Sequence, residues 1–245
     1  MIYAKGLFFA FPVMAVFTVA GLLNSMEVYG QQQTRTNQTT EFQDTFNLED
    51  CNFDSRGSNT YFILESGHQS VLEAQEDGEM VELIITVLNE TKVVNGTETR
   101  VVEERESEDG DLVEISRNYF AVCKPTNDVF YFGEDVDIYE NGEIVSHEGA
   151  WLAGENDARA GLFIPGNVQV GMKYYQEFAP GIAEDRAEII SVNDTLAVPA
   201  GNFTGVLKVE ETNPLEPDER EDNFYAPGIG VIQDETEKLV KYTLP

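Results

Sequence analysis

Short apolar runs separated by turn residues cover the chain from residue 61 to its end. Within the runs, apolar residues alternate with polar ones or cluster briefly, which is typical of strands rather than helices. Residues 80–88, MVELIITVL, are apolar on both faces, so we expect a strand near the centre of a sheet. Strands are predicted at residues 61–65, 70–75, 80–88, 99–107, 111–123, 129–132, 143–151, 162–164, 172–179, 186–192, 195–198, 206–211, 220–226, 230–233 and 238–244.

Tight turns join the first of these strands. Asn95-Gly96, Asp109-Gly110 and Asn141-Gly142 are two-residue hairpin signals, because both residues of each pair tolerate positive φ. Parallel pairing needs crossovers of about a dozen residues, and these gaps are shorter. The predicted fold class is therefore all-β, with one antiparallel, hairpin-rich sheet that forms a half-barrel or a sandwich.

The amino terminus has a different pattern. Residues 6–23 carry no charge and follow Lys5, and a polar exit leads to Gly30. We interpret residues 1–30 as a secretory signal cut near Gly30 or as an uncleaved membrane anchor. Residues 31–47 are rich in Gln and Thr, which predicts a flexible polar linker. A single β-rich domain at residues 48–245 is then expected outside the cytoplasm, secreted or at the cell surface.

The chain is strongly acidic, with 45 Asp and Glu against 15 Lys and Arg and a formal net charge of −30. This balance argues against nucleic acid as a partner, because a phosphate-neutralising surface is missing. Three causes of the acidity remain open: a solvated surface, adaptation to high salt, or binding of cations or a basic partner. Contact with a membrane is expected only through the N-terminal segment, if that segment is not cleaved.

Two features fit an exported chain. Cys51 and Cys123 are the only cysteines, and in an oxidising compartment they are expected to form one disulfide, with two separate buried thiols as the alternative. Five Asn-x-Thr sequons mark candidate glycosylation sites, at Asn37, Asn89, Asn95, Asn193 and Asn202.

Residues 117–151 mix aromatic and ionisable side chains more closely than any other segment. By strand parity Arg117 shares a face with Val113, Ile115 and Tyr119, so it is expected either in a structural ion pair or as an anion-binding group. His147 shares parity with Trp151 and is either a hydrogen-bonded core residue or a ligand or base. His68 is expected at the surface. The candidate ligand-binding residues, on one sheet face or around a cavity, are Arg117, Phe120, Phe130, Tyr131, Phe132, His147 and Trp151.

Acidic residues crowd two predicted loops. One contains Glu134, Asp135 and Asp137, and the other, around a Pro-Gly turn, contains Glu177, Glu184 and Asp185. Hard oxygen ligands of this kind suit Ca²⁺, although the spacing does not fit an EF-hand. A solvated acidic loop is the plainer interpretation. These six residues are the candidate calcium ligands if the two clusters meet in space, and no other cofactor is expected.

The second half contains VPAGNFTGVLKVEET, then NFYAPGIGVIQDE, then LVKY. This arrangement, with the Tyr-Ala-Pro-Gly-x-Gly turn, resembles the C-terminal hairpins of a group of exported, lipoprotein-like bacterial and archaeal β-sheet proteins. The resemblance covers about a third of the chain and implies an antiparallel β fold outside the cytoplasm, but no activity. The chain departs from lipoprotein members because no Cys lies near Gly30. The turn itself suits a structural role, since Pro227 fixes φ and Gly228 and Gly230 allow positive φ.

Motifs of common enzymes are missing: the sequence contains no G-x-S-x-G, H-E-x-x-H or P-loop pattern, and only two His. We therefore predict no catalytic residues. The leading hypothesis is a non-enzymatic exported β-sheet protein that binds an unknown ligand or surface partner. The alternatives are a Ca²⁺-stabilised surface protein and a carboxylate-dependent glycan hydrolase.

Overall fold

The computed structural model describes residues 41–76 and 78–245. The predicted signal or anchor, the linker up to residue 40 and Asn37 lie outside these residues. Within the described part, one 3-10 helix, η1 (Leu48–Asp50), precedes the strands. The first eight strands are β1 (Phe53–Asp54), β2 (Gln69–Glu76), β3 (Glu79–Val94), β4 (Thr97–Glu108), β5 (Asp111–Cys123), β6 (Asp128–Glu140), β7 (Glu143–Ser146) and β8 (Trp151–Leu152). They are followed by β9 (Arg159–Ile164), β10 (Lys173–Tyr175), β11 (Glu177–Phe178), β12 (Arg186–Val198), β13 (Gly201–Asn213), β14 (Glu216–Ala226), β15 (Gly230–Asp234) and β16 (Glu237–Thr243).

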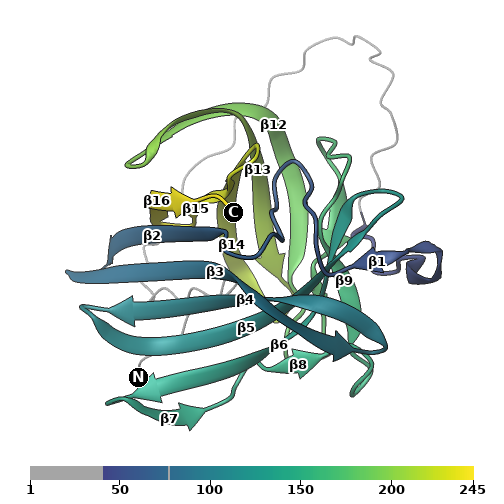
Figure 1. Cartoon of the computed structure of the whole chain (residues 1–245), viewed down its shortest axis with the longest axis horizontal. Helices are drawn as coiled ribbons and strands as arrows, with labels where there is room; N and C mark the ends of the chain where they lie inside the picture. The colour runs from purple at the N-terminus through teal and green to yellow at the C-terminus, as the bar shows by residue number, and fades with distance from the viewer. Residues whose placement is uncertain (1–40, 77) are drawn as a thin grey trace, which may run out of the picture.

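The named strands pair antiparallel in one sheet that runs from β10 through β12–β16 and β2–β6 to β9 and β11. Figure 1 shows β2–β6 side by side and β12–β14 curving back over them. The two ends of the sheet nearly meet, because Tyr174 of β10 donates to the Phe163 carbonyl of β9 at 3.4 Å. A Cβ on Gly161 would lie 2.1 Å from the Gln176 carbonyl oxygen, so this closure requires glycine. The all-β prediction is confirmed, and the sheet is a nearly closed barrel.

The predicted hairpin turns are confirmed by their backbone angles. Asn95, Asp109 and Asn141 have φ of 46°, 46° and 53°, and the glycine that follows each of them also has positive φ. The Tyr-Ala-Pro-Gly turn joins β14 to β15, and the Gly228 amide donates to the Thr60 carbonyl at 2.8 Å. Tyr225 and Ile229 both pack into the core.

Several predicted bounds differ from the structure. Residues 61–65 form only an isolated bridge at Ile63, because this segment folds into a loop over the barrel. Residues 143–151 split into β7 and β8 around a turn, and residues 172–179 split into β10 and β11. Residues 186–198 form one strand, β12, with irregular register rather than two strands. Within the described residues, contacts with the domain already occur before Leu48, because the ring of Phe42 lies 6.3 Å from that of Tyr175.

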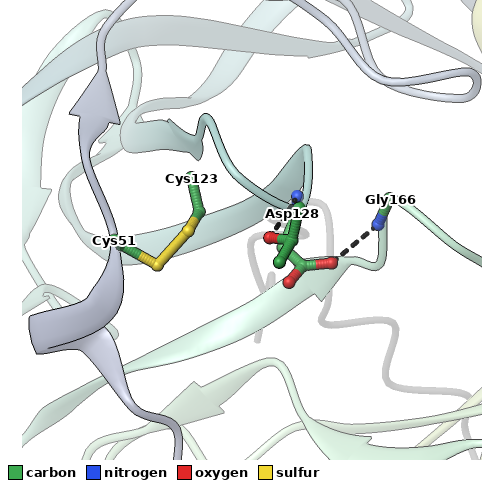
Figure 2. Close-up of a disulfide and its surroundings, with 5 residues drawn as sticks. Cys51, Cys123, Asp128 and Gly166 are labelled. Atoms are coloured by element: carbon green, nitrogen blue, oxygen red, sulfur yellow. Dashed lines mark hydrogen bonds between the residues drawn. A yellow bond between two sulfur atoms is a disulfide. The ribbon is translucent and has the colours of Figure 1, made fainter.

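The predicted disulfide is present between Cys51 and Cys123, with a sequence separation of 72. It ties the segment around η1 to the end of β5. Figure 2 shows it beside the turn after β5, where the Asp128 carboxylate accepts a hydrogen bond from the Gly166 amide at 2.8 Å. The bridge and this bond hold the start of β6 against neighbouring loops.

Alternate residues face the barrel interior. On β4 and β5, the face that carries Val102 and Phe120 also carries the buried Glu104, Glu106 and Glu114. On β13, Leu207 and Val209 are followed by Glu211 in the same parity, and all three are buried. The interior therefore has an apolar part and a part lined with carboxyl groups.

Candidate functional site

The best candidate site lies where β8 joins β6. Trp151 pairs with Glu134, and Leu152 pairs with Gly133. Gly133 has φ 120°, and a Cβ there would lie 2.2 Å from the Trp151 carbonyl oxygen, so only glycine allows β8 to approach. A register shift between the pairs Asn118–Glu134 and Phe120–Tyr131 inserts one extra residue into β6. This bulge keeps Tyr131 and Glu134 on the inner face.

A pocket of about 230 Å³ opens at this point. Its lining comes from β6, from β8, from the turn at residues 153–158 and from the Pro-Gly turn at residues 179–182. The first turn is held in an unusual conformation, because Asn156 and Asp157 have φ of 47° and 66°. Ile182, at 42% exposure, places an apolar side chain at the mouth. Such strained turns around a concave site are typical of binding sites.

The charged residues that line this pocket are Glu134, Asp135 and Glu155, all acidic. Burial, followed by the nearby charge of Glu114, raises the pKa of Glu134 to about 8. Burial opposes ionisation of Asp135 too, but hydrogen bonds from Lys92 and Tyr119 lower the pKa of that carboxyl. Lys92 Nζ lies 2.8 Å from the Asp135 carboxylate, so this charge is already paired.

Trp151 connects the pocket to carboxyl groups deeper in the barrel. Its Nε1 donates to Glu177 Oε2 at 3.1 Å, and its ring meets Tyr131 edge to face at 5.5 Å. Burial, followed by the charge of Asp185, raises the pKa of Glu177 well above its usual value. The same cause, with the charge of Glu211, raises the pKa of Asp185.

Gln176 extends this network. Its amide donates to Glu211 Oε1 at 3.0 Å, and its backbone amide donates to the Asp185 carbonyl at 2.8 Å. Burial raises the pKa of Glu211 to about 8, although hydrogen bonds from Gln176 and Asn223 act against the rise. Burial therefore disfavours the ionised form of each of these carboxyl groups.

The predicted ligand-binding residues do not all gather in one place. Phe120, Tyr131 and Trp151 lie together on the inner face, where the first two rings stack at 4.6 Å. Phe130 and Phe132 are on the other face of β6, and both pack against Phe53. Of the seven, the pocket lining includes Trp151 alone.

Arg117 and His147 meet at Asp137 on the outside of the barrel. Arg117 lies 3.2 Å from Glu103 and 3.3 Å from Asp137, so the structural ion-pair interpretation holds. His147 Nδ1 lies 2.7 Å from the Val136 carbonyl oxygen and 3.0 Å from Asp137. The parity argument that joined His147 to Trp151 was wrong, because β7 ends at Ser146 and a turn separates the two.

The expectation for His68 was also wrong. It is 6% exposed rather than at the surface, and burial lowers its pKa. The loop at residues 61–65 and the Tyr-Ala-Pro-Gly turn cover it, so it belongs to the packing of the barrel.

The six candidate calcium ligands divide between two places. Glu134, Glu177 and Asp185 are inside the barrel, whereas Asp135 and Asp137 bind basic groups outside it. Glu184 accepts a hydrogen bond from the Gly181 amide at 3.0 Å. In residues 41–76 and 78–245, no group of three or more His, Cys, Asp or Glu is arranged to hold a metal ion.

The four sequon asparagines within the described residues are all exposed: Asn89, Asn95, Asn193 and Asn202. Glycosylation stays a prediction. In the same part of the chain, no helix is long and apolar enough to cross a membrane.

Sequence reasoning missed Glu104, Gln176 and Glu211 as members of the interior polar network. One signal was present: on β13, Glu211 follows Leu207 and Val209 at alternate positions, so all three must share a face. Glu104 follows Val102 in the same way on β4.

Comparison with protein-family models, curated proteins and solved structures finds no match to this chain. The resemblance to exported lipoprotein-like proteins therefore stays a prediction.

Proposed function

We propose that this protein is a non-enzymatic binding protein, exported or held at the cell surface, that takes a small organic cation in the pocket at Trp151. The observation that carries the proposal is that Trp151 and the buried Glu134, which are cross-strand partners on β8 and β6, both line a pocket whose charged residues are acidic. Aromatic faces and carboxylates are the groups that bind protonated amines. The net charge of −30 would also attract cations toward the site.

The volume of the pocket and the disulfide support the same proposal. A volume of about 230 Å³ suits a ligand smaller than a typical drug molecule. The Cys51–Cys123 bridge supports an oxidising compartment, which agrees with export. For the glycan-hydrolase alternative, Asp135 is already bound by Lys92 and Tyr119, which leaves Glu134 and the exposed Glu155 as the carboxyl pair of the pocket.

Calorimetric titration at pH 8 tests the proposal, with benzylamine as the cation and benzyl alcohol as its neutral isostere. We expect benzylamine to bind about tenfold or more tightly than the alcohol, because a hydrogen-bonded charge contributes roughly 1.5–3 kcal/mol. Glu134→Gln should remove this difference. Trp151→Phe should lower the affinity for benzylamine a few-fold, since phenyl is a poorer cation–π partner than indole.

Glu148→Gln is the matched control, because it removes one exposed acidic charge from the segment before Trp151 and should leave both titrations unchanged. Equal binding of benzylamine and benzyl alcohol by the wild-type protein would overturn the proposal. A rise in melting temperature with millimolar Ca²⁺ that Glu134→Gln abolishes would favour the calcium alternative instead.

A further inference from the structure

The β3–β4 hairpin places one ammonium group of the protein itself beside the pocket. Lys92 Nζ donates to Asp135 Oδ1 and Oδ2 at 3.0 and 2.8 Å. It also lies 4.3 Å from the centre of the Tyr119 ring and 3.2 Å from the Tyr119 hydroxyl oxygen. Asp135 lines the pocket, and its side chain is 53% exposed. Lys92 therefore holds a carboxylate and an aromatic ring in the way that a bound amine would.

Two contacts fix the position of Lys92. The hydroxyl of the fully buried Thr99 donates to the Lys92 carbonyl at 2.8 Å. At the end of the hairpin, the Asn95 side chain packs against Gly154, where a Cβ would lie 2.8 Å from Asn95 Cγ. Gly154 belongs to the turn at residues 153–158 that lines the pocket. The ammonium group is therefore held on a hairpin that also contacts the pocket wall.

This ion pair changes the charge that a ligand meets. Lys92 neutralises Asp135, so the carboxyl groups left in the lining are the buried Glu134 and the exposed Glu155. Interactions of a fully exposed charge are weakened by water and by salt. A ligand with one ammonium group is matched by Glu134, whereas a second ammonium meets the exposed Glu155 and the positive charge of Lys92.

We propose that Lys92 is a specificity-determining residue, which occupies Asp135 as the ammonium of a ligand would and so limits the pocket to ligands with a single ammonium group. This inference rests on the proposed function. Lys92 acts through Asp135 rather than by contact with the ligand. Removal of its ammonium group frees the Asp135 carboxylate for the second charge of a diamine.

Matched amines in calorimetric titrations test this inference. In NaCl at about 0.5 M, which screens the overall charge of the protein, n-butylamine and 1,4-diaminobutane should bind the wild type within about twofold of each other. Lys92→Met should make the diamine bind about fivefold more tightly than the monoamine, since an ion pair with a half-exposed carboxylate has a strength of this order. Lys92→Arg should keep the wild-type ratio, because a guanidinium also neutralises Asp135. Lys92→Met/Asp135→Asn should return to that ratio, because it frees no carboxylate.

Lys208→Met is the matched control. Lys208 Nζ lies 2.6 Å from Asp222 Oδ2 and 5.5 Å from the centre of the Phe224 ring, so it forms the same kind of pair on β13 and β14. The substitution removes one positive charge from a similarly exposed ion pair whose residues are outside the pocket lining. The two amines should therefore keep their wild-type ratio.

The outcomes separate this inference from the proposed function. If benzylamine binds and Lys92→Met leaves the ratio of the two amines unchanged, Lys92 has a structural role alone and the proposed function stands. If no amine binds the wild-type protein, the proposed function fails and this inference fails with it. Should Lys92→Met not fold, Asp135→Asn provides the test. It leaves the Lys92 ammonium unpaired, so the diamine must lose more affinity than the monoamine, and an equal loss would overturn the inference.

Discussion

Thermal unfolding should shift to lower temperature as the pH rises from about 5 to about 8. The carboxyl groups responsible are inside the barrel, where burial raises the pKa of Glu134 and Glu211 to about 8 and raises the pKa of Glu177 and Asp185 well above their usual values. Above the usual carboxyl pKa of about 4.5, the unfolded chain loses these protons while the folded chain keeps them. The contribution of these carboxyl groups to folding stability is fully present below the usual carboxyl pKa and is lost as the pH rises through about 8.

Each such group lowers the free energy of unfolding as the pH rises within this window, and the four effects act in the same direction. Circular dichroism melts at pH 5, 6, 7 and 8 measure the combined effect. High ionic strength is the first control, because it screens repulsion among surface charges but not among buried groups. Glu211→Gln should flatten the pH dependence, whereas the exposed Glu148→Gln should run parallel to the wild type. A stability that rises from pH 5 to pH 8 would show that these carboxyls are ionised in the folded protein.

Loss of the disulfide should destabilise the protein by about 4 kcal/mol, given the sequence separation of 72 between Cys51 and Cys123. The expected effect is this large because the bridge restricts a long loop of the unfolded chain that contains β1–β5. Chemical denaturation of Cys51→Ala and Cys123→Ala measures it. Both variants lack the same cross-link, but only Cys123 is fully buried, so a difference between them reports packing around Cys123. Wild-type stability in Cys51→Ala would contradict the chain-entropy argument.

The hairpins of the first half could be predicted because their turns are local. Asn95-Gly96, Asp109-Gly110 and Asn141-Gly142 need positive φ, and sequence alone identifies residues that accept it. Closure of the sheet could not be predicted. It depends on β10 reaching β9 and on the contact between Gly161 and Gln176, which brings together elements that no short pattern connects.

The candidate site was predicted only in part. Trp151 and Glu134 were both named, but for different roles, because the acidic run after Gly133 resembled a loop. It is the second half of β6, where pairing with β5 and β7 outweighs the low strand propensity of its acidic residues. The bulge at Gly133 then turns Glu134 inward while Asp135 stays with Lys92. A bulge changes the parity of every later residue, so alternation alone could not place either side chain.

The central claim is that the interior carboxyls hold protons that an organic cation displaces. Titration of benzylamine at pH 7 in buffers of different ionisation enthalpy measures the protons released on binding. Because the pKa of Glu134 is raised to about 8 and a bound ammonium lowers it, close to one proton should be released per amine bound, and Glu134→Gln should release fewer. Binding of benzylamine with no release of protons would contradict the account.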